Sequence, residues 1–366
     1  MQRTLMPSLP GADLEHILAH AGDCLEQLRG KNLFVTGGTG FFGRWMLESF
    51  AFMNERLGLG AHATVLTRNP EGIAARAPGI AAYPGIRFVR GDVRELRRDS
   101  ILAQLAAGHS GQFEYCIHAA MDSVGQDDPL ATFDTIVGGA RAALEFAVAS
   151  GTRRLLFTSS GAVYGKQPSE ITHVSEAYLG GPDCNGTASA YGEGKRAAEL
   201  LCACFHQRHP SLEPVIARCF AFVGPLLPLD AHFAIGNFIR DALRGGPIKI
   251  GGDGTPYRSY LYAADLAIWL WTMLFTGKPN RAYNVGSEED VTILELAKRV
   301  AECFPNKVEI ELARQPNPQE RPSRYVPDTK LAGCEMGLRT LIPLTEAISR
   351  TAAWHRLNTP EFQPAS

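Results

Sequence analysis

Residues 32–43 read Asn-Leu-Phe-Val-Thr-Gly-Gly-Thr-Gly-Phe-Phe-Gly, and this stretch decides the fold. Asn32–Thr36 has the apolar character of a short buried strand, and an apolar stretch of helical type follows the glycines. Gly37, Gly40 and Gly43 stand between the two in the spacing GxxGxxG. The first glycine allows a tight turn, the second lets a pyrophosphate approach the backbone, and the third lets helix and strand pack closely. Because free N–H groups at a helix start attract phosphate, the stretch predicts a dinucleotide site.

Strand and helix signals alternate after this turn. Segments of strand type lie at His62–Thr67, Ile86–Arg90, Tyr115–His118, Arg154–Thr158 and Pro214–Ala217, separated mostly by helical stretches that include 129–149 and 190–208. Continuous apolar strands between helices indicate a parallel sheet that is covered on both faces. The expected fold class is therefore α/β, with a doubly wound Rossmann sheet.

The expected organisation has three parts. Residues 1–30 form an N-terminal helical leader whose helix Asp13 can cap, and 31–220 form the dinucleotide-binding Rossmann domain. Over 221–350, prolines and glycines break the chain into short pieces, which is typical of a smaller α+β substrate-binding lobe. A segment near 280–290 returns to the Rossmann sheet as a strand. Helices in this part are expected at 232–244, 263–276 and 292–303.

The composition excludes several classes of protein. The 366 residues are 45% hydrophobic and 20% charged, as in a globular chain with a large core. A net charge of −2 gives no general attraction for nucleic acid or an acidic membrane, so neither is expected as a partner. The longest strongly apolar run, Leu266–Phe275, is shorter than the about 18 residues of a membrane span, and the N-terminus lacks the apolar core of a secretory signal.

The cysteines point to a reducing compartment. The chain has 8 cysteines and no CxxC pair, so we expect reduced buried thiols, no metal site and a cytoplasmic protein.

The residues after the second strand indicate which dinucleotide binds. An acid there favours NAD, whereas an arginine holds the 2′-phosphate of NADP. The chain reads Thr67-Arg68-Asn69-Pro70 and offers no acid, so Arg68 favours NADP. Asp92 and Val93 follow the third strand and are placed to touch the adenine. The alternatives are an exposed loop arginine at 68 and a turn aspartate at 92.

Tyr191-Gly-Glu-Gly-Lys195 opens a helix and carries the second motif. The i,i+4 spacing puts Tyr191 and Lys195 on one face, where the ammonium is expected to lower the phenol pKa toward working pH. Gly192 and Gly194 are poor helix residues, which indicates that another group approaches this face closely. Ser160 lies at the carboxyl end of a strand, where ligands bind, and is either a donor to a reacting oxygen or a turn-capping serine.

Together these motifs resemble the extended short-chain dehydrogenase/reductase family, in its NAD(P)-dependent nucleotide-sugar epimerase/dehydratase branch. The resemblance covers roughly residues 31–340. It rests on the glycine turn, Gly91-Asp92-Val93, His118-Ala119-Ala120, Ser159–Gly165, Tyr191 with Lys195, Arg218, Gly224-Pro225, Gly252-Asp253-Gly254, Arg258, Asp265 and Asn284-Val285-Gly286. It implies that NAD(P) binds at Gly37, Gly40, Phe41, Phe42, Gly43, Arg68, Asp92, Val93, Ala119, Ala120, Tyr191 and Lys195.

The resemblance also implies roles for the site residues. Tyr191 is the acid/base, Lys195 anchors the cofactor ribose and tunes the phenol, and Ser160 contacts the sugar hydroxyl. Arg258 and Arg321 are expected on the diphosphate of a nucleotide-sugar substrate. Many relatives dimerise through the helix that bears the tyrosine and the helix before it, so a homodimer is expected.

The position after Ser160 separates the reactions of the family. Sugar 4,6-dehydratases carry Asp-Glu or Glu there, whereas Gly161 and Ala162 transfer no proton, which disfavours dehydration and decarboxylation. The leading hypothesis is 4-epimerisation of a nucleotide sugar through a transient 4-keto sugar. The alternative is an NADPH-dependent 4-keto-6-deoxy nucleotide-sugar reductase, which Arg68 supports. A non-catalytic cofactor-binding scaffold is opposed by the intact Tyr191, Lys195 and Ser160.

Overall fold

The computed structural model of the protein describes residues 8–105, 110–120, 128–231 and 233–362, and its described part forms two compact units. Unit 1 takes the chain up to Gly165, together with Gly180–Cys219 and Ala267–Tyr283. Unit 2 takes Lys166–Leu179, Phe220–Leu266 and the chain from Asn284 onward.

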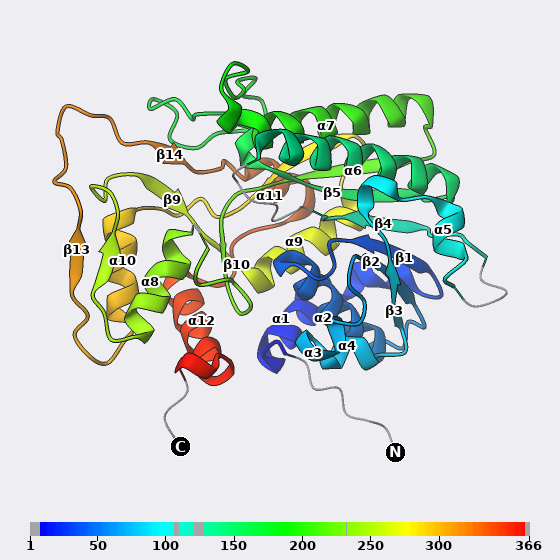
Figure 1. The fold of residues 1–366 in the computed structure, drawn as a ribbon, viewed down its shortest axis with the longest axis horizontal. Helices are drawn as coiled ribbons and strands as arrows, with labels where there is room; N and C mark the ends of the chain where they lie inside the picture. The colour runs from blue at the N-terminus through cyan, green and yellow to red at the C-terminus, as the bar shows by residue number, and fades with distance from the viewer. Residues whose placement is uncertain (1–7, 106–109, 121–127, 232, 363–366) are drawn as a thin grey trace. The chain divides into compact units, whose positions relative to one another are not determined.

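A seven-stranded sheet carries unit 1 (Figure 1). Its order is β11-β6-β5-β4-β1-β2-β3. The strands are β1 (Asn32–Thr36), β2 (His62–Thr67), β3 (Ile86–Arg90), β4 (Tyr115–His118), β5 (Arg154–Ser160), β6 (Glu213–Cys219) and β11 (Arg281–Val285). Every pairing from β6 to β3 is parallel. The Rossmann fold is therefore confirmed, including the late strand β11. The chain winds outward in both directions from β1, so the switch point where such sheets bind ligands lies between β1 and β4.

Helices cover both faces of this sheet. Figure 1 shows α6 (Pro129–Ala149) and α7 (Ala190–Arg208) side by side on one face, with α1 (Gly11–Leu25) and α2 (Phe41–Arg56) on the other. Every residue of β4 and β5 is buried, as expected for strands covered on both sides. The rings of Phe34, Phe113 and Phe146 lie 4.2–5.7 Å apart and join β1 to α6 in the core.

Short elements complete unit 1. They are η1 (Glu26–Leu28), α3 (Ile73–Arg76), α4 (Pro78–Ala82), η2 (Val93–Glu95), α5 (Arg98–Leu102), η3 (Gly161–Tyr164) and η4 (Thr187–Ser189). The helix α9 (Ala263–Thr276) contributes its residues from Ala267 onward.

The leader helix α1 begins earlier than predicted. It starts at Gly11 after Pro10, so the prediction that Asp13 caps it is wrong. Asp13 is instead buried in the first turn, where a negative charge interacts favourably with the helix dipole. Ahead of the helix, the backbone N–H of Leu9 donates to Glu48 of α2 at 2.8 Å, and Arg44 pairs with the same carboxylate at 2.6 Å. The described leader is thus held on α2 within unit 1.

Unit 2 is built from short strands and helices. Its small sheets are β10-β7, β12-β9-β14 and β13-β8. The strands are β7 (Phe222–Val223), β8 (Ile248–Ile250), β9 (Tyr257–Ser259), β10 (Leu261–Tyr262), β12 (Asp290–Thr292), β13 (Ile310–Leu312) and β14 (Arg324–Tyr325). The helices are α8 (Ala234–Leu243), α10 (Ile293–Glu302), α11 (Lys330–Met336), α12 (Leu344–Asn358) and η5 (Pro360–Phe362). Thr292 and Glu295 form a reciprocal capping box that starts α10.

The division into units differs from the predicted boundary at residue 220, with its return near 280–290, in two segments. Residues 166–179 belong to unit 2, because Asn284 donates to the Val174 carbonyl at 2.9 Å and Gln167 bonds to Val326. Residues 267–283 belong to unit 1, where the Trp271 indole donates to Ser49 at 2.9 Å.

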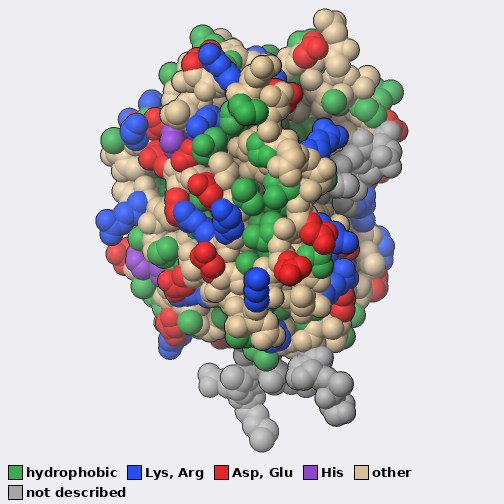
Figure 2. Space-filling view, turned by 90° about the vertical axis from the view of Figure 1, so that its left-hand side faces the viewer, with side chains coloured by type: hydrophobic (Ala, Val, Ile, Leu, Met, Phe, Trp, Pro, Cys, Tyr) green, Lys and Arg blue, Asp and Glu red, His purple; other side chains and the backbone are tan. Residues whose placement is uncertain are grey.

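The surface carries both signs of charge. On the face drawn in Figure 2, basic and acidic side chains are interspersed around a hydrophobic centre. Among the described residues, no helix is long and apolar enough to cross a membrane.

Arg154 is the polar link between the sheet and α9. Its side chain is 7% exposed and donates to the Leu274 carbonyl at 2.6 Å and to the Gly277 carbonyl, and it pairs with Glu213 at 3.0 Å. Replacing Arg154 with methionine leaves these acceptors without their donor. We expect the free energy of unfolding to fall by about 3 kcal/mol.

Urea unfolding followed by tryptophan fluorescence measures this loss. The exposed neighbour Arg153 provides the control, since Arg153→Met is expected to change the unfolding midpoint little. Equal stability of the two variants contradicts this role of Arg154.

Candidate cofactor and catalytic site

The glycine turn lies against the end of β4. Gly37 has a φ of +74°, and a Cβ added to it would lie 2.3 Å from the Ala119 carbonyl and 2.5 Å from the Ala120 nitrogen. A Cβ on Gly43 would lie 2.2 Å from the Gly37 oxygen. Only glycine allows both approaches, so the predicted close packing of strand, turn and helix is present.

A cavity of about 310 Å³ opens beside this turn at the carboxyl ends of β1, β2 and β3. It is lined by Thr36, Gly37, Thr39, Leu66, Thr67, Arg68, Asn69, Arg76, Gly91, Asp92, Val93, Ala120 and Thr135. Of the predicted cofactor residues, the cavity brings together Gly37, Arg68, Asp92, Val93 and Ala120.

Other predicted cofactor residues lie around the cavity rather than in its lining. Gly40 precedes the first residue of α2, and Phe41 and Phe42 open that helix with their rings 5.9 Å apart. Gly43 and Ala119 pack against the turn as described. They shape the backbone around the cavity.

Thr135 supplies a polar group that the sequence did not single out. Its side chain lies in the cavity wall and is 6% exposed, and its hydroxyl has no hydrogen-bond partner in the described chain. A buried unpaired hydroxyl is costly unless a ligand satisfies it. No local pattern distinguishes Thr135 from other helix threonines, so sequence reasoning missed it.

Two arginines line the cavity, of which the sequence predicted one. Arg68 follows β2 and Arg76 ends α3, and both side chains are exposed. Asp92 is engaged locally, since its carboxylate accepts from the Arg94 backbone at 2.9 Å and from its guanidinium at 2.7 Å. These bonds hold the pKa of Asp92 below its usual range. Asp92 therefore both lines the cavity and caps the turn η2.

Ser160, Tyr191 and Lys195 come together where β5 meets α7. The Ser160 hydroxyl accepts from the Ala162 backbone at 3.1 Å, and the Ser160 side chain acts on the Tyr191 phenol by lowering its pKa. A Cβ on Gly192 would lie 2.7 Å from the Ala162 oxygen, so the predicted close approach to this helix face is confirmed. Ser160 therefore caps η3, as one alternative predicted, and its role as a donor to a reacting oxygen stays a prediction.

Lys195 is buried beneath this pair. Its side chain is 3% exposed, its ammonium donates to the Thr158 carbonyl at 2.8 Å, and it lies 5.0 Å from the centre of the Phe157 ring. Burial lowers the pKa of Lys195 to about 8. Burial also raises the pKa of Tyr191, with the Ser160 bond acting in the opposite direction. Lys195 is not among the groups that shift the Tyr191 pKa, so the predicted lowering of the phenol pKa by Lys195 is not found in this structure.

Comparison with known protein families identifies the family to which this chain belongs. Residues 33–286 match the NAD dependent epimerase/dehydratase family. The chain belongs to this family. It is thus an enzyme of the extended short-chain dehydrogenase/reductases, as the motifs implied.

Its relatives catalyse several reactions on nucleotide sugars. UDP-glucuronic acid decarboxylase 1 of Arabidopsis thaliana is 30% identical over 321 residues, which are 87% of this chain and 68% of that protein. UDP-glucuronic acid decarboxylase 3 of the same plant is 29% identical, covering 90% of each chain.

Solved structures of the family share the fold. UDP-glucose 4-epimerase of Thermus thermophilus, in complex with NAD, has a TM-score of 0.72 and 25% identity, with coverage of 90% of this chain and 100% of that chain. UDP-glucose 4-epimerase of Thermotoga maritima, solved with UDP-glucose, has a TM-score of 0.72 at 21% identity, covering 89% and 99%, and shows the fold alone.

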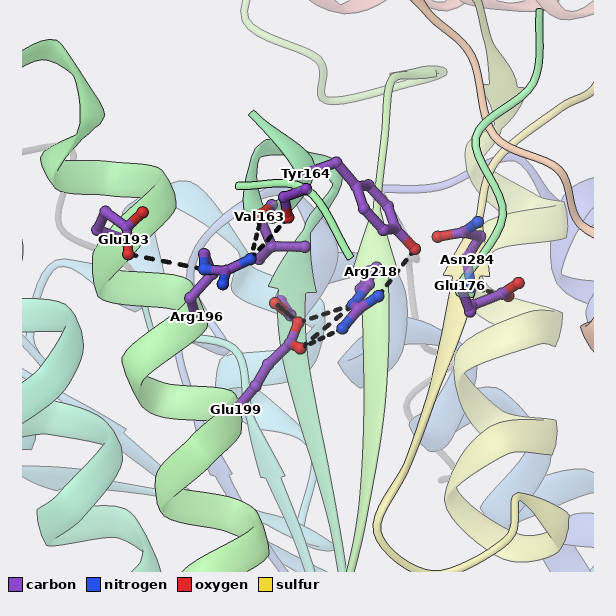
Figure 3. A network of polar contacts seen from close by, with 10 residues as sticks. Val163, Tyr164, Glu176, Glu193, Arg196, Glu199, Arg218 and Asn284 are labelled. Atoms are coloured by element: carbon purple, nitrogen blue, oxygen red, sulfur yellow. Dashed lines mark hydrogen bonds and ion pairs between the residues drawn. The ribbon is translucent and has the colours of Figure 1, made fainter. Parts of the chain in front are cut away.

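An ion-pair network joins α7 to β6 (Figure 3). Glu199 of α7 pairs with Arg218 of β6 at 2.7 Å, and Arg218 donates to the Tyr164 hydroxyl at 2.9 Å. The sequence motifs included Arg218 but not Glu199. The spacing of Glu199, one turn after Lys195, was the signal that could have found it.

The two predicted substrate arginines lie in unit 2. Arg258 on β9 is half-buried and donates to the Tyr257 carbonyl at 2.7 Å. Arg321 is exposed and donates to the Ser169 hydroxyl at 3.2 Å. Their contact with a diphosphate stays a prediction.

The cysteines are less buried than expected. Cys116, Cys202 and Cys219 are buried, but Cys184, Cys204 and Cys334 are exposed, and all eight are free thiols. The described residues contain no group of three or more His, Cys, Asp or Glu that could hold a metal.

The approach of Gly37 to β4 gives a test of the turn. We expect Gly37→Ala to weaken dinucleotide binding and to lower stability by about 1–3 kcal/mol from the positive φ alone. Thermal unfolding and fluorescence titration with NADPH measure the two effects. Gly138→Ala in α6 is the control, because a Cβ there meets open space. Wild-type affinity and stability in Gly37→Ala refute the steric role.

Proposed function

We propose that the enzyme is an NAD(P)-dependent nucleotide-sugar 4-epimerase that works through a transient 4-keto sugar. The supporting observation is the turn η3, where Gly161 and Ala162 follow Ser160 and carry no group that exchanges protons. Dehydration and decarboxylation require further proton transfers, whereas 4-epimerisation requires only the Tyr191 proton. The comparisons do not decide the reaction, because the sequence relatives named above are UDP-glucuronic acid decarboxylases and the solved structures named above are 4-epimerases that share the fold.

The cavity residues fit a dinucleotide. The start of α2 offers free N–H groups to a pyrophosphate, Gly40 at its N-cap leaves room for it, and the unpaired Thr135 hydroxyl offers a hydrogen bond. A bound nicotinamide supplies hydride acceptance and return.

The chain itself supplies proton transfer and orientation. Tyr191 removes the proton from the sugar O4 and later returns it, and Ser160 holds the same oxygen by a hydrogen bond. The Lys195 ammonium binds ribose hydroxyls, and its charge favours the phenolate when the site is filled. Arg258 and Arg321 are proposed to hold the substrate diphosphate.

We also propose that the enzyme prefers NADP to NAD. Arg68 and Arg76 both line the cavity, and Asp92, the one acid among its described lining residues, is already bonded to Arg94. Two arginines suit a 2′-phosphate. The same observation favours the second candidate function, an NADPH-dependent reductase of a 4-keto-6-deoxy nucleotide sugar.

Cofactor stoichiometry separates the two candidates. Turnover of a UDP-sugar with catalytic amounts of bound cofactor and no net change in absorbance at the NADPH band supports the epimerase. Consumption of one NADPH for each product formed identifies the reductase instead.

A homodimer is proposed through the outer faces of α6 and α7. The two helices pack together, and Leu130 of α6 and Leu200 of α7 are 70% and 65% exposed. Exposed leucines on neighbouring helices provide apolar surface for a second copy.

Tyr191→Phe removes the hydroxyl that moves the proton. We expect a loss in kcat of about 10²-fold or more, with cofactor binding retained. Epimerisation rates and NADPH fluorescence measure the two effects. Tyr83→Phe, which removes a tyrosine hydroxyl bonded to Asn54 away from the site, is the control and should leave kcat unchanged. A near-normal rate in Tyr191→Phe removes Tyr191 from its role.

Charge removal at the cavity tests the cofactor preference. The double variant Arg68→Ala/Arg76→Ala is expected to bind NADP about 10-fold or more less tightly, with little change for NAD, because two charged hydrogen-bond donors are lost. Calorimetric titration with each dinucleotide measures this. Arg56→Ala, on α2 outside the cavity lining, is the control. An equal loss for both dinucleotides contradicts the proposed 2′-phosphate contact.

A further inference from the structure

Three functional groups follow one another along a single face of α7. Tyr191, Lys195 and Glu199 are four residues apart, so their side chains lie on the same side of the helix. All three act on neighbouring residues of β5. Lys195 donates to the Thr158 carbonyl at 2.8 Å and Glu199 accepts from the Ser159 hydroxyl at 2.5 Å, while Ser160 lowers the pKa of Tyr191.

Glu199 is held from two strands at once. Besides Ser159 of β5, it accepts from Arg218 of β6, whose Nη2 lies 2.7 Å from Oε2 and whose Nε lies 3.1 Å from Oε1 (Figure 3). The side chains of Arg218 and Glu199 are only 17% and 11% exposed. A bidentate pair of this kind fixes geometry more tightly than a single contact does.

Arg218 extends the network to the turn after Ser160. Its Nη1 donates to the Tyr164 hydroxyl at 2.9 Å, and its guanidinium lies 4.8 Å from the centre of the Tyr164 ring. Tyr164 ends η3, the turn that Ser160 caps. Glu199 and Arg218 therefore hold the residues on both sides of Ser160.

We propose that Glu199 is a positioning residue for the Tyr191–Lys195 pair. Clamped by Arg218 and Ser159, it fixes the register of α7 on β5 and supplies the negative charge that keeps Lys195 protonated. The inference rests on the proposed function only for what Lys195 does in turnover.

The charges around Lys195 support the electrostatic part. The groups that face it are Glu199 and Tyr191 on α7, Cys219 on β6 and His118 on β4. His118 is neutral because burial lowers its pKa to about 3, and Cys219 is a thiol because burial raises its pKa to about 12. Tyr191 is a neutral phenol, since burial raises its pKa. Among these four residues around Lys195, Glu199 is thus the one that carries a negative charge.

The sign of the effect follows from these charges. Burial lowers the pKa of Lys195, whereas Cys219 and then Glu199 raise it. Because Cys219 is a neutral thiol at the pH where Lys195 titrates, the Glu199 carboxylate is the charge that acts on Lys195 there. Removing that carboxylate lets Lys195 lose its proton at a lower pH. Removing Arg218 instead removes the positive charge that partly neutralises the Glu199 carboxylate. The negative charge of Glu199 then acts more strongly on Lys195, which keeps its proton to a higher pH.

NMR of the full chain labelled with ¹³Cε-lysine measures this titration without any substrate. The chain has eight lysines, and Lys195→Arg assigns the signal. We expect the Lys195 midpoint to fall by roughly 1 pH unit in Glu199→Gln and to rise in Arg218→Gln. Glu193→Gln, on the same helix but paired with Arg196 at 3.6 Å, is the matched control and should not shift it.

The outcomes are distinct. Opposite shifts in Glu199→Gln and Arg218→Gln support the proposal, and if one of them does not fold, the shift in the other decides. An unchanged Lys195 midpoint in a folded variant overturns it. Where the wild type turns over a nucleotide sugar, the alkaline limb of kcat is expected to shift with the midpoint, and Glu199→Asp should restore it. Failure of turnover rejects the proposed function but leaves the lysine titration as the test of Glu199.

Discussion

The close approach of Gly37 to the end of β4 is the constraint on which the site depends. The order in which strands are added to the sheet reverses between β1 and β4. The turn after β1 therefore has to pass the Ala119–Ala120 backbone to start α2. A Cβ at Gly37 would occupy the space of that backbone. With glycine there, the start of α2 and the ends of β2 and β3 enclose one cavity, which gives a phosphate-bearing ligand free N–H groups and two arginines.

The second constraint is the burial of the reacting groups. The Lys195 side chain is buried between α7 and β5 with a carbonyl and an aromatic ring as neighbours, and that environment favours its neutral form. The same burial raises the pKa of the Tyr191 phenol. A site of this kind holds its charges at a cost in stability, which is typical of groups tuned for proton transfer. In our proposal the Glu199 carboxylate, one helical turn away, offsets part of that cost for Lys195.

The sequence allowed prediction of features that are local. The apolar strands β1 to β6 and the helices α6 and α7 were predicted because their hydrophobic periodicity and their turn residues lie at neighbouring positions in the sequence. The glycine turn and the Tyr191–Lys195 spacing belong to the same class. Features that depend on partners distant in the chain were missed, namely the Arg76 and Thr135 cavity contacts and the place of 267–283 in unit 1. The direction of the Tyr191 pKa was mistaken for the same reason, since spacing shows charge but not burial.

The central claim is that the chain inverts C4 with a single exchangeable proton and no net redox change. Mass spectrometry and proton NMR of the product formed from a UDP-hexose in D₂O test it most directly. The account predicts an inverted C4 centre, the mass of the substrate and no deuterium bound to carbon. Loss of water or carbon dioxide, or solvent deuterium at C5, would contradict it, because each needs the acid–base group that Gly161 and Ala162 do not provide.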